Sequence, residues 1–171
     1  PNKVREEIKA VITNGIKNET VLQFLGGISQ RVNVYENYCN LFSKEFISPL
    51  SSIGDRFYQY RGADTQTISG EKYYHLFFTP SQEGENTFSG DCWIHSTTWA
   101  IQKITLNISA TANINFINRL TVIQEFQQTK EKLWVFAKDK IIAYLSPFKK
   151  SKLSFIGRKT ATYKDVHVNT A

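Results

Sequence analysis

The segment from Lys72 to Ser109 decides the fold, and it reads KYYHLFFTPSQEGENTFSGDCWIHSTTWAIQKITLNIS. Apolar and polar residues alternate in three runs of this segment, at 72–79, 87–95 and 99–109. Alternation with a period of two is typical of half-buried β-strands, and the short turn-forming stretches between the runs favour antiparallel neighbours. We therefore predict a three-stranded antiparallel meander at the centre of the domain.

The apolar positions of these runs also predict a register. Matching their parity places Phe78 opposite Phe88, and Gly90 opposite Ile104, on a face that we expect to be buried. A sheet that is apolar on both sides is covered twice or curves around a cavity. The opposite side, called the second face below, carries side chains that we predict to bind a ligand: Tyr73, Phe77, Trp93, Trp99 and Ile101.

A polar cluster interrupts the second face. The predicted register places Asp91 between His75 and Lys103. A carboxylate beside an imidazole can orient the ring and raise its pKa, which is an arrangement used in acid-base catalysis. A cross-strand ion pair needs the same residue types, and no nucleophile lies near the cluster in sequence. We therefore favour a structural role and keep a hydrolase that uses His75 and Asp91 as a remote alternative.

The chain before the meander changes from helical to extended character. Residues 1–27 carry apolar side chains at three- and four-residue spacing, which predicts an amphipathic helical segment that the pair Gly26 and Gly27 ends. Residues 31–164 carry further alternating runs, including one at 56–60, with Ile47 to Leu50 as a connector, and predict an antiparallel β region. The predicted class is α+β: a mainly antiparallel, curved, half-barrel-like sheet with the N-terminal helix packed on it.

Length and composition bound the remaining possibilities. A chain of 171 residues is expected to be a single domain, 1–171, and the absence of methionine indicates a piece excised from a larger protein. The net charge of +6 is concentrated between residues 130 and 164, but no nucleic-acid-binding signature accompanies it.

No metal or cofactor motif occurs, so neither a metal site nor a cofactor is predicted. Cys39 and Cys92 are expected to be buried thiols, with one disulfide as the alternative.

Several short strings resemble a known family when they are taken in order. These strings include NVYEN at 33–37, FISPLS at 46–51, TFSGDCWI at 87–94 and NINF at 113–116. They look like an uncharacterised Gram-negative outer-membrane family, whose members carry an N-terminal carboxypeptidase-regulatory-like β-sandwich, then a region of unknown function, then an outer-membrane barrel. This chain is similar to the middle region. The strand pattern is more loosely similar to the half-barrel of lipoprotein carriers.

The resemblance implies a place and a role. It implies a non-enzymatic domain on the periplasmic side of the outer membrane, with the flanking domains of the same chain as neighbours. Together with the aromatic second face, it leads us to expect binding of a hydrophobic ligand, either a lipid or a lipoprotein, or of an envelope partner. The alternative is a structural spacer between the β-sandwich and the barrel.

Overall fold

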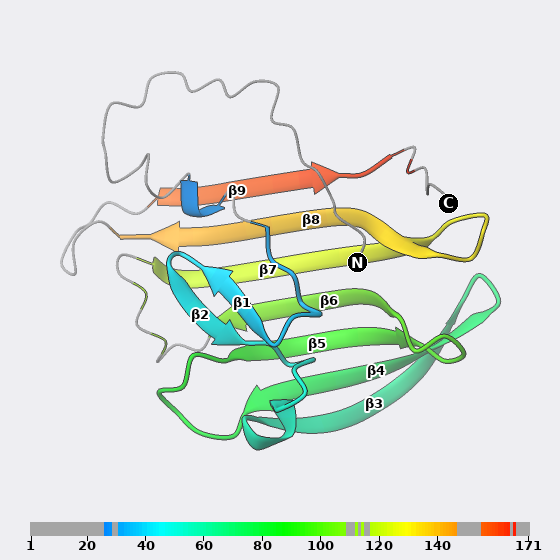
Figure 1. Cartoon of the computed structure of the whole chain (residues 1–171), viewed down its shortest axis with the longest axis horizontal. Helices are drawn as coiled ribbons and strands as arrows, with labels where there is room; N and C mark the ends of the chain where they lie inside the picture. The colour runs from blue at the N-terminus through cyan, green and yellow to red at the C-terminus, as the bar shows by residue number, and fades with distance from the viewer. Residues whose placement is uncertain are drawn as a thin grey trace.

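Antiparallel β-sheet dominates the computed structural model, which describes residues 26–28, 31–108, 112, 114, 117–146, 155–164 and 166. A seven-stranded sheet runs through the domain with its strands side by side in chain order (Figure 1). Its strands are β3 (Tyr58–Ile68), β4 (Glu71–Pro80), β5 (Phe88–His95), β6 (Ile101–Ile108), β7 (Ile117–Gln128), β8 (Trp134–Leu145) and β9 (Phe155–Thr162).

The central meander is confirmed as β4, β5 and β6, and the sheet extends it on both sides. The sheet is open, with β3 and β9 as its two edges. The predicted mainly antiparallel region is therefore confirmed. Most of the predicted helical segment 1–27 lies outside the described residues, as does any packing of that helix on the sheet.

The glycine pair at the end of this segment has another role than the predicted one. Gly26 and Gly27 are themselves helical together with Ile28, so the pair does not break helical structure at its own position. The ring of Phe42 lies where a Cβ on Gly27 would be. Glycine therefore allows the backbone to pass directly against this ring.

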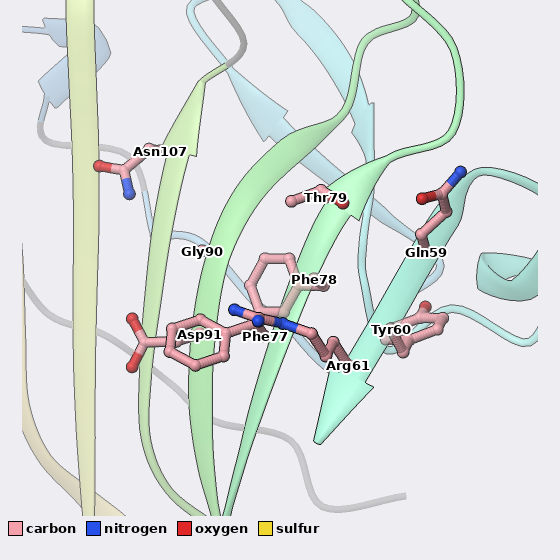
Figure 2. Close-up of a pocket in the computed structure, with 9 residues that line it drawn as sticks. All are labelled: Gln59, Tyr60, Arg61, Phe77, Phe78, Thr79, Gly90, Asp91 and Asn107. Carbon is pink, nitrogen blue, oxygen red and sulfur yellow. The ribbon is translucent and has the colours of Figure 1, made fainter. Parts of the chain in front are cut away.

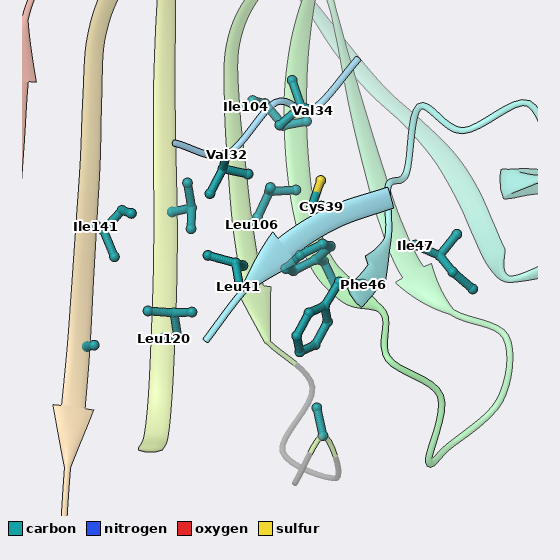
Figure 3. Packing of buried hydrophobic residues seen from close by; sticks show 14 of the residues in the cluster. Val32, Val34, Cys39, Leu41, Phe46, Ile47, Ile104, Leu106, Leu120 and Ile141 are labelled. Atoms are coloured by element: carbon teal, nitrogen blue, oxygen red, sulfur yellow. The ribbon is translucent and has the colours of Figure 1, made fainter. Parts of the chain in front are cut away.

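A small two-stranded sheet covers one face of the large one. β1 (Tyr38–Leu41) and β2 (Lys44–Ile47) form a hairpin that crosses the middle strands in Figure 1. Ile47, predicted as part of a connector, therefore ends a strand. Figure 3 shows apolar side chains of the hairpin pointing into the layer between hairpin and sheet. The fully buried large side chains of this layer include Leu41, Phe46, Phe78, Phe88, Ile104, Leu106, Leu120, Val122 and Ile141.

Buried polar groups attach this cover to the sheet. The hydroxyl of Tyr58 donates a hydrogen bond to the carbonyl of Ile47 and accepts one from the backbone N–H of Phe88, at 3.0 Å. On β7, the amide Nε2 of Gln124 donates to the carbonyl of Val32, at 2.7 Å, in a site from which water is excluded. A buried carbonyl without such a donor costs about 1–3 kcal/mol, so both side chains help to fix the position of the cover.

The observed register differs from the predicted one by two residues. Phe78 lies opposite Gly90, whereas the prediction placed it opposite Phe88. Across the next strand pair, Gly90 lies opposite Leu106, whereas the prediction placed it opposite Ile104. A shift of two residues preserves the face of every side chain, because strand side chains alternate with a period of two. The prediction of which residues share a face therefore holds where the ladder is regular.

One irregularity overturns the predicted face of Ile101. The ladder between β5 and β6 shifts between Trp93 and Ile94, so that Ile101 lies opposite Ile94. This places Ile101 in the hydrophobic core, where it is 3% exposed, and not on the second face. A β-bulge inserts an extra residue in one strand and thereby reverses the side-chain parity beyond it.

The close packing of Gly90 makes a prediction about two matched substitutions. A Cβ on Gly90 would overlap the backbone oxygen of Thr105 and lie 3.0 Å from the ring of Phe78, whereas a Cβ on Gly62 would meet nothing within 4 Å. We expect Gly90→Ala to lower the free energy of unfolding by about 3 kcal/mol or more, and Gly62→Ala to change it by less than about 0.5 kcal/mol. Urea denaturation followed by circular dichroism measures both. Equal stability of the two variants would contradict the packing.

Candidate functional site

An open cleft lies on the second face next to the β3 edge of the sheet. Its volume is about 670 Å³, which is within the usual range of small-molecule sites. Figure 2 shows its side chains arranged over three neighbouring strands and the end of a fourth. The lining residues are Gln59, Tyr60 and Arg61 of β3, Phe77, Phe78 and Thr79 of β4, Gly90 and Asp91 of β5, and Asn107 of β6.

A row of one guanidinium and three rings in contact runs along the second face from this cleft. The guanidinium of Arg61 lies over the ring of Phe77, 5.2 Å from its centroid. The ring of His75 lies 4.4 Å from Phe77, and on its other side it stacks on Trp93 at 4.0 Å with an interplanar angle of 9°. Each neighbour thus holds the next in place, because stacking and cation–π contacts depend on orientation.

The predicted pairing of His75 with Asp91 is present, although in a different way. Phe77, and not His75, lies directly opposite Asp91 in the ladder. The imidazole nevertheless reaches the carboxylate diagonally, with 3.0 Å between Nε2 and Oδ2. Both side chains are partly buried, at 17% and 26% exposure. The carboxylate fixes the plane of the ring, and Trp93 and Phe77 flank it.

Lys103 does not complete the predicted row. The ladder places it opposite Trp93 on one side and opposite Glu125 on the other. Glu125 in turn lies opposite Lys138, so charges of alternating sign cross β6, β7 and β8. Opposite charges in cross-strand positions stabilise a sheet by about 0.2–1 kcal/mol each, which is a structural role.

The five predicted ligand-binding residues fall in different surroundings. Phe77 alone lines the cleft. Trp93 borders the same row through His75, whereas Tyr73 is buried and lies edge-on against His95, with centroids 5.3 Å apart. Trp99 projects from the turn between β5 and β6, where it is 70% exposed. The fifth residue, Ile101, belongs to the core as described above.

Of the cleft residues, the sequence prediction named only Phe77 and Asp91 as site residues, and Arg61 and Asn107 are two of those that it missed. The expected strand around residues 56–60 was too short to include Arg61, but its alternation, continued by one residue, would have placed Arg61 on the second face. Asn107 lies in a predicted strand, and its Oδ1 accepts a hydrogen bond from the hydroxyl of Thr121, at 2.8 Å. A polar residue within a strand gives no sequence signal that distinguishes such a ladder contact from a binding group.

The cysteine nearest to the cleft is poorly suited to nucleophilic chemistry. Cys92 follows Asp91 but points to the core face, where it is 1% exposed and has a free thiol. Burial, reinforced by the nearby charge of Asp91, raises the pKa of this thiol to about 12. Because the thiolate is the reactive form, the thiol is inert near neutral pH. Cys39 is also free and buried, so the expectation of two buried thiols is confirmed.

Two features are absent from the described residues, a cluster of metal ligands and a helix that could cross a membrane. Within those ranges, no group of three or more His, Cys, Asp or Glu side chains is placed to hold a metal ion. Among the same residues, no helix has the length and apolarity that a bilayer crossing requires.

Comparison with known protein families gives a match over nearly the whole chain. The model of a protein family matches residues 1–166, and its description reads "Family of unknown function (DUF5686)". No curated protein and no solved structure matches the chain.

The burial of the two thiols leads us to expect that the protein loses stability at alkaline pH. Burial raises the pKa of Cys39 to about 11 and that of Cys92 to about 12, from an ordinary value of 9.0. The unfolded chain therefore loses these protons first, and stability that is present below pH 9 is lost as the pH rises toward the folded pKa values.

The same burial predicts how the two thiols react. We expect a thiol-reactive disulfide reagent at pH 8 to label both cysteines only after unfolding in urea. Rapid labelling of the native protein would contradict the burial.

Proposed function

Because the chain belongs to this family of unknown function (DUF5686), we propose its function from its geometry: a non-enzymatic binding module that holds one amphipathic ligand in the cleft. The ligand class is an acyl chain or similar apolar body that carries an acidic group. The observation that carries the proposal is the position of Arg61, whose guanidinium lies over Phe77 within an open cleft.

The cleft offers both halves of such a ligand a matching partner. Phe77 provides an aromatic surface for an apolar body, and burial of apolar area is worth roughly 25 cal/mol per Å². In the described part of the chain, Arg61 forms no ion pair with a carboxylate, so its planar fork of N–H donors is available to an acidic group. Asp91 accepts a hydrogen bond from His75 and so competes less for the guanidinium.

The proposed setting is the periplasmic side of the outer membrane. The resemblance of the Phe46–Ser51 and Thr87–Ile94 strings to an outer-membrane family supports this setting. In this setting, the proposed amphipathic ligand is a lipid or the acyl group of a lipoprotein. The flanking domains of the same chain then bring the cleft to its ligand.

A structural spacer is the second candidate. The filled core beneath the hairpin cover supports it, because a rigid domain of this kind can hold its neighbours apart without binding anything. The remote alternative, a hydrolase, draws support from the hydrogen bond between His75 and Asp91. Against it, the His75 ring is stacked on Trp93 and lies close to Phe77, a setting that suits a fixed structural imidazole better than a mobile proton carrier.

Binding of a fluorescent fatty acid tests the proposal. We expect saturable binding of the probe by the wild-type chain, weakened roughly tenfold or more by Arg61→Gln, because a charge-assisted hydrogen bond is worth about 1.5–3 kcal/mol. The methyl ester of the same probe lacks the acidic group, so Arg61→Gln should affect its binding little. Phe77→Ala and Trp93→Ala should weaken the binding of both probes, the second by removing the ring on which His75 stacks.

Arg158→Gln is the matched control, because Arg158 is exposed on β9 at the far edge of the sheet. It should bind both probes as the wild type does. Failure of the wild type to bind either probe would contradict the proposal and favour the structural spacer. Equal weakening by the Arg61 and Arg158 variants would show a general charge effect and not a site.

A further inference from the structure

Three hairpin turns lie together at one end of the sheet, and each carries an exposed apolar side chain. The turns join β3 to β4, β5 to β6 and β7 to β8, and Figure 1 shows all three on the right. Their apolar side chains are Ile68, Trp99 and Leu133, which are 44%, 70% and 44% exposed. The largest side chain in the protein is thus among the most exposed, although a Trp in water loses most of the apolar burial that it can contribute.

A network centred on His95 holds the three turns in fixed positions. Its Nε2 lies 3.1 Å from Oε2 of Glu71 in the first hairpin, and its Nδ1 lies 2.8 Å from the hydroxyl of Thr98 in the second. The indole Nε1 of Trp134, from the third hairpin, donates to that same hydroxyl at 3.0 Å. His95 is only 5% exposed, so these contacts form a rigid base beneath the exposed side chains.

The backbone at Trp99 is strained in a way that presents its side chain outward. Its φ is 57°, in the left-handed region that bulky residues rarely adopt. Such a conformation costs on the order of 1–3 kcal/mol and persists where the surrounding structure imposes it. Here the N–H of Trp99 donates to the carbonyl of His95 at 2.9 Å, and the indole stacks on Tyr74 with 5.8 Å between centroids.

The turn backbones already satisfy many of their own N–H groups. Thr98 N–H donates to the His95 ring, Lys132 N–H donates to the carbonyl of Thr129, and Leu133 N–H donates to the hydroxyl of Thr129. An N–H group that has a protein partner loses little when water is removed from around it. These turns can therefore enter an apolar environment at low cost.

Basic side chains surround the apolar ones. Lys72 follows the first turn, and Lys130 and Lys132 lie within the third, all of them exposed. Two acidic residues lie among them, Glu71 and Glu131, and the carboxylate of Glu71 is occupied by His95. An excess of cations beside apolar side chains complements a surface that is anionic outside and apolar beneath.

We propose that this end of the sheet docks on a lipid bilayer, with Trp99, Leu133 and Ile68 entering the interface between headgroups and acyl chains. Trp prefers this interface because its ring is apolar and its N–H is polar. The lysines then lie at the level of the anionic headgroups. A protein partner would need a contiguous area of about 800 Å² on this side, whereas three apolar tips on separate turns suit shallow insertion better.

Co-sedimentation with vesicles tests the proposal on the full 171-residue chain. The vesicles are phosphatidylcholine alone and phosphatidylcholine with phosphatidylglycerol. We expect the wild type to bind both, more strongly with the anionic lipid. Trp99→Gly should lower the partition constant by about tenfold, the effect of losing one buried aromatic side chain. Glycine accepts the positive φ at this position, so the fold should remain intact.

Two further readouts separate insertion from other effects. Lipids brominated along the acyl chain should quench the tryptophan fluorescence of the wild type, and Trp99→Gly should abolish that quenching although Trp93 and Trp134 remain. Leu133→Ser should weaken binding, whereas Ile156→Ser should not. Ile156 is a matched control because it is 51% exposed but lies opposite Tyr144, near the other end of β8. The cleft variant Arg61→Gln should bind vesicles normally.

Three results would overturn the proposal. The first is an absence of wild-type binding to either kind of vesicle. The second is equal binding by the wild type and Trp99→Gly, or equal losses in Trp99→Gly and Ile156→Ser. The third is self-association of the wild type in sedimentation equilibrium that Trp99→Gly removes while vesicle binding is unchanged, since the patch would then be an interface between copies of this chain.

Discussion

An open sheet must bury one face under something else, and the rest of this structure depends on how residues 31–57 meet that need. The sheet does not close on itself, so its apolar side chains have no partner across a barrel interior. The hairpin of β1 and β2 supplies one, and its position is fixed by the hydrogen bonds at Tyr58 and Gln124. Because these groups are buried, any sliding of the cover would leave them without partners.

In the described part of the chain, the hairpin covers one face of the sheet, and the open cleft lies on the other. Second-face side chains of the cleft such as Arg61 and Phe77 lie outside the buried core, so we expect their substitution to have small effects on stability. The three hairpin turns that carry Ile68, Trp99 and Leu133 likewise lie outside the core, except for the buried side chain of His95 beneath them. The cleft and the three hairpin turns are therefore separate surfaces of the same sheet, and the two proposals assign to them a single molecule and an extended lipid surface.

The sequence predicted the faces of the sheet better than its pairing. Alternation determines which side chains share a face, but any register that differs by an even number of residues satisfies it equally. The turn lengths decide among such registers, and nothing in Ser96–Ala100 indicates that Trp99 adopts a left-handed conformation. The same turn is followed by the bulge that transfers Ile101 to the core. Irregularities of this kind depend on tertiary packing and are not visible in a local pattern.

The candidate site shows the same limit in a different form. His75 and Asp91 were predicted as a pair and do form a hydrogen bond, because long side chains reach diagonal as well as direct neighbours. Lys103 was predicted beside them from the same register, and the shift of two residues moved it away. Arg61 was missed because the end of a strand is the least reliable part of a sequence-based assignment.

The hydrogen bond between Gln124 and Val32 also sets an order for folding during synthesis. It joins residues 92 positions apart, so the cover leaves the ribosome long before the sheet that it must lie on. Meanwhile Val32, Val34, Leu41 and Phe46 have no surface to bury against, although each is fully buried in the finished domain. Each strand of the meander, in contrast, finds its neighbour as soon as the next one emerges. The cover is thus synthesised before the sheet but secured after it, and it is the part that a holding chaperone would need to shield.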